Sequence, residues 1–207
     1  MIRATRLALL LLLGACTGIT TDIAAVRAPE FASNDYSKVC VSAPDADIRL
    51  ATGTEAALAD GLRARGVAAI RLGDLLFVGK PHEEAEIAAK VRESGADAFL
   101  VLKPVSSSTE ERWIPPSITT TTDYGRRSRP WGWGYSTTWV SGGYSVSMPR
   151  ATLEARLFDV ASEQVVWVAS VEASGNASAN WLDLRTAAAA KVVERLDADH
   201  LLRNRAE

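Results

Sequence analysis

The sequence predicts one α/β (or α+β) domain with a mixed β-sheet and helices packed against it, behind an N-terminal export signal. Three observations support this fold class. Short strand-like apolar runs alternate with helical periodicities between residues 39 and 103, as in parallel β-α-β units. Apolar and polar residues then alternate over residues 152–173, which is typical of an antiparallel hairpin, and a long amphipathic helix follows.

The first fifteen residues have the layout of a signal peptide. Arg3 and Arg6 precede an apolar run over residues 7–13, and small residues then lead to Cys16. The run is far shorter than the roughly 20 residues of a membrane-spanning helix. This pattern resembles the lipobox of bacterial lipoprotein precursors, which implies removal of residues 1–15 and lipidation of Cys16. An ordinary secretory signal is the alternative.

The resemblance to lipoproteins also implies a location. Thr17 stands where an aspartate usually retains lipoproteins in the inner membrane, so we expect the outer membrane, on its periplasmic face. Several acyl chains on one residue would give a durable membrane anchor. The net charge of −2 and this compartment argue against nucleic acid as a partner.

After the signal, we expect a lipidated tether over residues 16–37 and then the domain over residues 38–200. Its first half should contain three or four strands separated by two helices. The predicted helices begin at Thr54 and Pro81 and end at Gly66 and Gly95. The predicted strands cover residues 39–42, 67–72 and 97–103, with a further short run at 74–78.

The C-terminal third has the clearest patterns. Residues 152–159 and 165–173 alternate and predict an antiparallel hairpin. Asn180 should cap a long helix, and its core face carries Trp181, Leu184, Ala188, Val192 and Leu196 at helical spacing. Residues 201–207 are expected to form a short tail.

The insert at residues 106–149 differs in composition from the rest of the chain. It holds four of the six tryptophans and three of the four tyrosines, among glycine, serine, threonine and arginine. Residues 136–140 and 144–148 flank Ser-Gly-Gly and would suit a hairpin that projects from the sheet.

Three interpretations of the insert remain open. It is a partly disordered low-complexity segment whose rings cover the sheet edge, a protein-contact surface, or a surface for glycan or membrane headgroups. Trp, Tyr and Arg dominate protein-binding hot spots. The candidate interaction residues are therefore Arg126, Arg127, Arg129, Trp131, Trp133 and Tyr135.

No pattern of catalytic residues stands out. His82 and His200 lack the spacing of a zinc site, and we expect no metal and no cofactor. Glu110 with Glu111, and Asp45 with Asp47, are acidic pairs on polar, loop-like stretches. Cys40 lies in a short apolar run, as a small buried hydrophobe would. We therefore expect a protein that is not an enzyme.

The phrase Ala96-Asp-Ala-Phe-Leu-Val-Leu102 and the pattern Leu157-Phe-Asp…Gln164-Val-Val-Trp167 resemble a loose group of periplasmic α/β domains. That group includes the amino-terminal domain of TolB, CsgG and LpoB. Ser162-Glu163 replaces its usual Thr-Gly turn. The resemblance implies a non-catalytic envelope adaptor or assembly factor that docks to an envelope protein or to further copies of itself. A peptidoglycan- or lipopolysaccharide-binding module, or a self-assembling structural lipoprotein, is the alternative.

Overall fold

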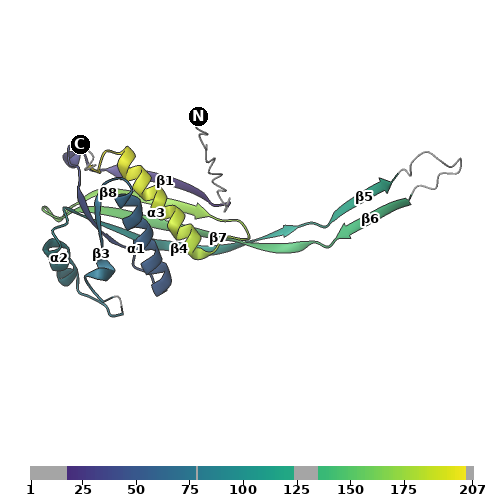
Figure 1. Ribbon diagram of the computed structural model, residues 1–207, viewed down its shortest axis with the longest axis horizontal. Helices are drawn as coiled ribbons and strands as arrows, with labels where there is room; N and C mark the ends of the chain where they lie inside the picture. Colours follow the sequence, from purple (N-terminus) through teal and green to yellow (C-terminus); the bar gives the residue numbers. More distant parts are fainter. Residues whose placement is uncertain (1–17, 78, 124–134, 204–207) are drawn as a thin grey trace, which may run out of the picture.

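The computed structural model describes residues 18–77, 79–123 and 135–203 (Figure 1). It confirms the α/β class with a mixed sheet. Six strands are arranged in the order β1-β8-β7-β4-β2-β3, with β2 parallel to β3 and β4 and the other neighbours antiparallel. Their bounds are β1 Thr20–Arg27, β2 Lys38–Ser42, β3 Ala68–Arg71, β4 Ala98–Ile114, β7 Tyr144–Asp159 and β8 Val165–Ser174. Two further strands, β5 Ser117–Asp123 and β6 Tyr135–Ser141, pair only with each other.

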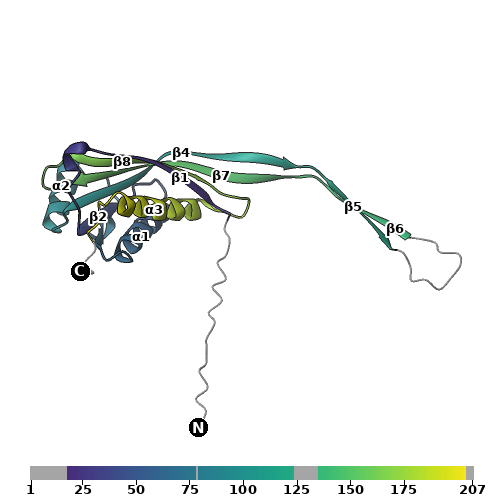
Figure 2. The ribbon, with the colours of Figure 1, turned by 90° about the horizontal axis from the view of Figure 1, so that it is seen from above.

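Helices lie on both faces of the sheet. The long helices α1 (Ile48–Arg63) and α3 (Trp181–Ala198) cover one face, below the sheet in Figure 2. The short helix α2 (Glu84–Glu93) packs on the other face, and 3-10 turns occur at Pro29–Phe31 and Leu72–Asp74. Alternation along β4 explains the division, because Leu100 joins the main core under α1 and α3 while Phe99 joins a smaller cluster with α2.

Helices α1 and α3 run parallel and close together. A Cβ added to Gly53 would lie 2.6 Å from a methyl carbon of Leu182, and one added to Gly61 would lie 3.4 Å from Val193. Both helices therefore begin at the same end of the domain. The predicted cap of α3 is confirmed, because Asn180 accepts from the backbone N–H of Asp183 in a capping box.

Helix α1 begins earlier than predicted. The carboxylate of Asp47 accepts the backbone N–H of Arg49 at 2.8 Å and caps the helix. Thr54 was the expected cap, but it lies inside the helix and donates its hydroxyl to the carbonyl of Leu50 at 2.6 Å. Gly66 has φ of +76° and ends the helix as expected.

Two smaller predictions in this half are also wrong. Pro81 was the expected first residue of helix α2, but the helix begins at Glu84. Glu83 is still extended and precedes the first helical residue. The expected strand at 74–78 is absent from the described residues 74–77, since Leu72–Asp74 forms a 3-10 turn that already reverses the chain. The helix stop at Gly95, with φ of +70°, is confirmed.

The expected tether is part of the folded domain. Residues 20–27 form β1, which pairs antiparallel with β8 along its whole length. Its exposure alternates, and Ile23 and Ala25 pack against the main core. The pattern escapes notice in the sequence because most of its core-facing and outward-facing residues are small.

The expected tail also begins inside the domain. Leu201 and Leu202 are buried, and Tyr36 forms an isolated bridge with Leu202. Beside them the guanidinium of Arg27 donates to the carbonyl oxygens of Phe31 and Asp199, at 2.7 and 2.8 Å. The C-terminal end of α3 is thereby tied to the segment that follows β1.

Among the described residues, none of the helices has both the length and the apolarity needed to cross a bilayer.

Candidate functional site

Strands β4 and β7 continue far beyond the six-stranded sheet as a two-stranded ribbon (Figures 1 and 2). We call residues 106–123 and 135–152 the arm, whose base still pairs with β8 through residues 150–152, and the remaining described residues the body. The ladder runs from Ser106 opposite Thr152 to Ile114 opposite Tyr144, and β5 and β6 continue it without a change of register. A register shift between Pro104 and Ser106 marks the base of the arm, where proline supplies no N–H to the ladder.

The hairpin expected between residues 136–140 and 144–148 is therefore wrong in its pairing. Both segments are extended as predicted, but they follow each other along the same side of the arm. Their partners are β5 and β4, from the other side of the insert. Gly142 and Gly143 do not turn the chain, because they lie between two consecutive strands on one side of a continuous ribbon.

The arm has a joint between its proximal and distal parts. Pro115 and Pro116 interrupt one side at the level where Gly142 and Gly143 interrupt the other. The ring of Trp113 lies so close to Gly143 that a Cβ there would sit 2.4 Å from a ring carbon. Glycine is therefore required at this position, and the tryptophan closes the joint from one face.

The apolar side chains of the arm are sorted by face. Because side chains alternate along a strand and partners opposite each other share a face, the register places even-numbered and odd-numbered residues on opposite faces. The even-numbered face, which we call the aliphatic face, carries the apolar residues Ile114, Ile118, Val140, Tyr144, Val146 and Met148. On the opposite face, which we call the tryptophan face, Trp113 lies opposite Ser145, Trp139 lies opposite Thr119, and Ser117 and Ser141 lie between these two levels.

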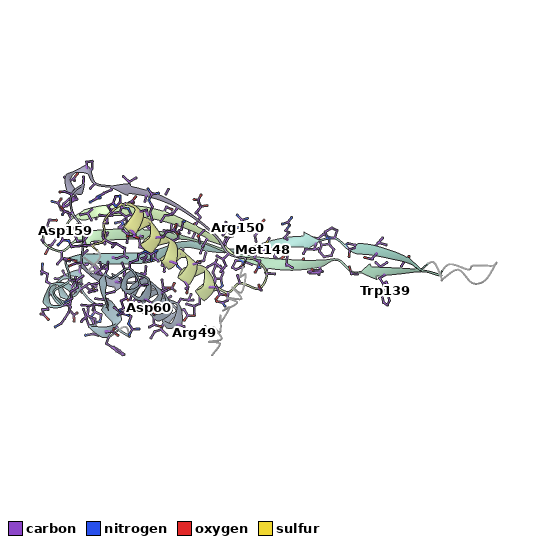
Figure 3. The ribbon with its side chains drawn as sticks, turned by 45° about the horizontal axis from the view of Figure 1, so that its top comes forward. Arg49, Asp60, Trp139, Met148, Arg150 and Asp159 are labelled. Atoms are coloured by element: carbon purple, nitrogen blue, oxygen red, sulfur yellow. The ribbon has the colours of Figure 1, made fainter. Side chains whose placement is uncertain are left out.

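Much of this apolar surface is exposed. Ile118 and Val140 face each other across the strands and remain 69% and 64% exposed. Trp139 is 70% exposed, and Figure 3 shows its side chain pointing away from the ribbon. Contiguous exposed apolar surface of this kind marks a contact site more often than scattered single residues do.

The base of the arm is polar. A side-chain nitrogen of Arg150 lies 2.6 Å from a carboxylate oxygen of Glu110, next to a hollow of about 260 Å³. Its lining is rich in hydroxyl groups, with Asp22 and Glu172 opposite each other on β1 and β8. Further along the same face, a hydrogen bond from Arg156 lowers the pKa of Glu154.

Most of the predicted interaction residues cannot be placed in the structure. They are Arg126, Arg127, Arg129, Trp131 and Trp133, which lie outside the described residues, as does Cys16. Tyr135 is the first residue of β6, opposite Asp123. Sequence reasoning missed the aliphatic face, although the alternation of Ile114, Ile118, Val140, Tyr144, Val146 and Met148 was a signal that could have found it.

The groups considered for catalysis are engaged in ordinary contacts. The imidazole of His82 contacts the carboxylate of Glu86 at 2.9 Å and the carbonyl oxygen of Phe77 at 2.8 Å, and both contacts raise the pKa of His82. His200 follows α3 with φ of +55°. Asp45 pairs with the buried Arg185, at 3.0 Å.

The acidic pairs are divided as well. Asp47 caps α1 while Asp45 reaches α3, and Glu110 lies on the opposite face of the arm from Glu111. Within the described ranges, no three His, Cys, Asp or Glu side chains are grouped as metal ligands. Cys40 is fully buried, as expected, and burial raises the pKa of its thiol to about 12.

A second hollow, of about 360 Å³, lies between α2 and the sheet. Phe99, Phe158 and Ile87 contribute to its apolar lining. An ion pair between Arg92 of α2 and Glu163 of the β7–β8 turn lies at its rim. Glu163 has φ of +59°, a conformation that usually belongs to glycine.

No protein-family model matches the sequence, and no curated protein sequence matches it. Solved structures do share the fold. The PelC dodecamer from Paraburkholderia phytofirmans superposes with a TM-score of 0.50 at 17% identity, over 89% of this chain and 100% of that chain. A dodecamer of a single-substitution variant of the same PelC gives 0.51 at 16% identity, with the same coverage. At this identity the likeness shows a common fold.

Proposed function

We propose that this protein is a non-enzymatic lipoprotein of the cell envelope, which acts as an adaptor or assembly factor through protein contacts made by its arm. In this proposal Cys16 carries the lipid anchor, on the periplasmic face of the outer membrane. The observation that carries the proposal is the arm itself, a ribbon with sorted and exposed apolar faces that nothing else in the described chain covers (Figure 2).

The arm is an incomplete structure on its own. An isolated two-stranded ribbon is at best marginally stable in water, and stability normally needs a third strand or a packed face. Strands β5 and β6 pair with each other, and among the described residues no further strand lies along the outer edge of either one. A protein partner supplies both missing elements, because it offers apolar side chains and hydrogen-bonding groups together.

We assign the two faces to different contacts. The aliphatic face also carries Arg112 and Thr138, but its apolar residues form one group on either side of the joint and suit a second copy, whose matching face has the same shape and chemistry. The dodecamers formed by PelC, which shares the fold, support assembly of this chain with itself. The tryptophan face, with hydroxyl groups between two exposed indoles, suits a different envelope protein.

Paired variants separate these contacts. Ile118→Thr with Val140→Thr makes the aliphatic face polar, and Trp113→Thr with Trp139→Thr makes the same change on the opposite face. Threonine keeps the strand propensity of the ribbon in both pairs.

We expect the aliphatic pair to reduce the particle to a smaller species in light scattering of the detergent-solubilised protein. The tryptophan pair should keep the particle size and lose envelope proteins recovered by crosslinking. A third variant, with Trp131, Trp133 and Tyr135 changed to alanine, tests the predicted interaction residues in the same crosslinking assay. Unchanged size and unchanged recovery in all three variants would contradict the proposal.

A glycan-binding module is the second candidate, favoured by one observation. Exposed indoles on one face of the arm and the hydroxyl-lined hollow at its base would suit sugar rings and their hydroxyls. Co-sedimentation with purified peptidoglycan sacculi tests this candidate. Sedimentation that the Trp113→Thr, Trp139→Thr variant abolishes would favour glycan, whereas an adaptor remains in the supernatant.

A further inference from the structure

We infer that the end of the body from which the arm projects lies directly on the lipid headgroups of the bilayer. This inference rests on the proposed anchor at Cys16. Folding of β1 removes the flexible tether, so the ordered chain begins almost at the anchor. The occupant of this surface is therefore a lipid surface.

The number of residues between Cys16 and Gly18 limits the distance between the proposed anchor and the body. The backbone carbonyl of Gly18 accepts the N–H of Asn176 at 3.2 Å, so the chain already contacts the body there. An extended chain spans at most about 3.6 Å per residue, so Cys16 lies within about 7 Å of Gly18. Acyl chains on Cys16 that enter the bilayer must bring this part of the body to the headgroups.

The register shows which end of the body this is. Thr20 lies opposite Ser174, and Ser174 lies opposite Arg150 at the base of the arm. The start of β1 and the base of the arm therefore lie at the same end of the body (Figure 2).

The same end has a surface that suits headgroups. Helices α1 and α3 both begin here, so the first turns of both helices lie at this end of the body. Ile48 in the first turn of α1 is 57% exposed, and Leu182 in the first turn of α3 is 37% exposed. The opposite end of the body, by contrast, is closed by the contacts of Arg27 with Phe31 and Asp199.

Two matched cysteines test the inference in the full-length, lipidated protein. Ala177→Cys lies in the exposed turn after β8, at the anchor end, and Ala161→Cys lies in the exposed turn between β7 and β8, at the other end. The ten residues of β8 separate the two sites by roughly 30 Å. Cys40 is buried with a pKa of about 12, so it should not compete for the label.

Each variant is labelled with a fluorophore and reconstituted in vesicles whose headgroups carry a nitroxide quencher. We expect quenching several-fold stronger at Ala177→Cys than at Ala161→Cys. Insertion of a 20-residue Gly/Ser linker between Cys16 and Gly18 should abolish the difference, because such a linker spans roughly 25 Å.

Equal quenching at the two sites, or no effect of the linker, would overturn the inference. A label at residue 177 that is shielded from water but not quenched would show that protein, and not lipid, covers this end of the body. This result would also overturn the inference. Intact mass and vesicle flotation give a separate readout of the anchor. Loss of both would contradict the lipoprotein proposal itself, whereas an acylated protein with equal quenching contradicts only the contact.

Discussion

The joint of the arm should depend on Gly143 and tolerate change at Gly142. In the variant Gly143→Ala, the new methyl group would lie 2.4 Å from a ring carbon of Trp113, so the ring must move by about 1 Å or leave the joint. At Gly142 a Cβ meets no atom within 4 Å, so Gly142→Ala is a matched control. Neither glycine has positive φ among the described residues, so alanine adds no backbone strain at either position.

The exposed fraction of Trp113 determines how much stability the arm can lose in Gly143→Ala. A tryptophan buries up to roughly 250 Å² when fully covered. Trp113 is 61% exposed, so its contacts cover about 100 Å², worth at most about 2.5 kcal/mol at 25 cal/mol per Å². Because the ribbon is marginal by itself, this loss should open the arm locally while the body stays folded.

Amide hydrogen exchange measures the effect by segment. We expect peptides of β5 and β6 to exchange up to about 60-fold faster in Gly143→Ala than in Gly142→Ala, since 1.4 kcal/mol is a factor of ten. Peptides of α3 should exchange equally in both variants. Equal protection of the arm in the two variants would refute the role of Trp113, and faster exchange of α3 would show that the joint is not local.

Three further predictions concern the body. Glu163→Gly should raise the free energy of unfolding by about 1 kcal/mol in urea titrations, because glycine adopts the positive φ of this residue without strain and only an exposed ion pair with Arg92 is lost. A lower free energy of unfolding would show that the ion pair contributes more than the strain costs. Asp45→Asn leaves Arg185 buried without its charge partner and should lower the free energy of unfolding by about 3 kcal/mol. A further Arg185→Met change should restore much of this loss. A loss below about 1 kcal/mol in Asp45→Asn would contradict the prediction. Burial raises the pKa of Glu55 above its ordinary 4.5, so the folded state binds the proton more tightly than the unfolded state does. The contribution of Glu55 to the free energy of unfolding is therefore present below pH 4.5 and is lost as the pH rises through the raised pKa. Glu55→Gln should remove that part of the pH dependence in urea midpoints at pH 4.5 and 7, and an unchanged difference between the two midpoints would refute it.

The elements that the sequence predicted well are those whose signals are local. The cap at Asn180, the helix stops at Gly66 and Gly95 and the alternation over residues 152–159 each depend on a few adjacent residues. Strand β1 was missed because its core-facing side chains, such as Ala25, are too small to mark a period. Its place in the fold depends on β8, which lies about 150 residues further along the chain.

The arm shows a different limit of local patterns. The extended segments around Gly142 and Gly143 were predicted correctly. Their pairing was not, because a glycine pair between two strands gives the same sequence pattern in a hairpin turn and in a straight joint. The pairing depends on Pro115 and Pro116, which lie about 25 residues earlier and interrupt the partner strand at the same level. Only the continuous register shows that the aliphatic residues share one face.

In the arrangement proposed above, the strand order gives the body a mechanical role between the anchor and the arm. Strand β1 pairs along its length with β8, and β8 pairs in turn with β7, one of the two strands of the arm. A force between the proposed anchor and a partner bound to the arm would therefore act along three adjacent strands joined by hydrogen bonds. No flexible loop lies on this path among the described residues, since Thr20, Ser174 and Arg150 lie side by side. The body would thus fix the position of the arm relative to the proposed anchor, as the proposed adaptor function requires.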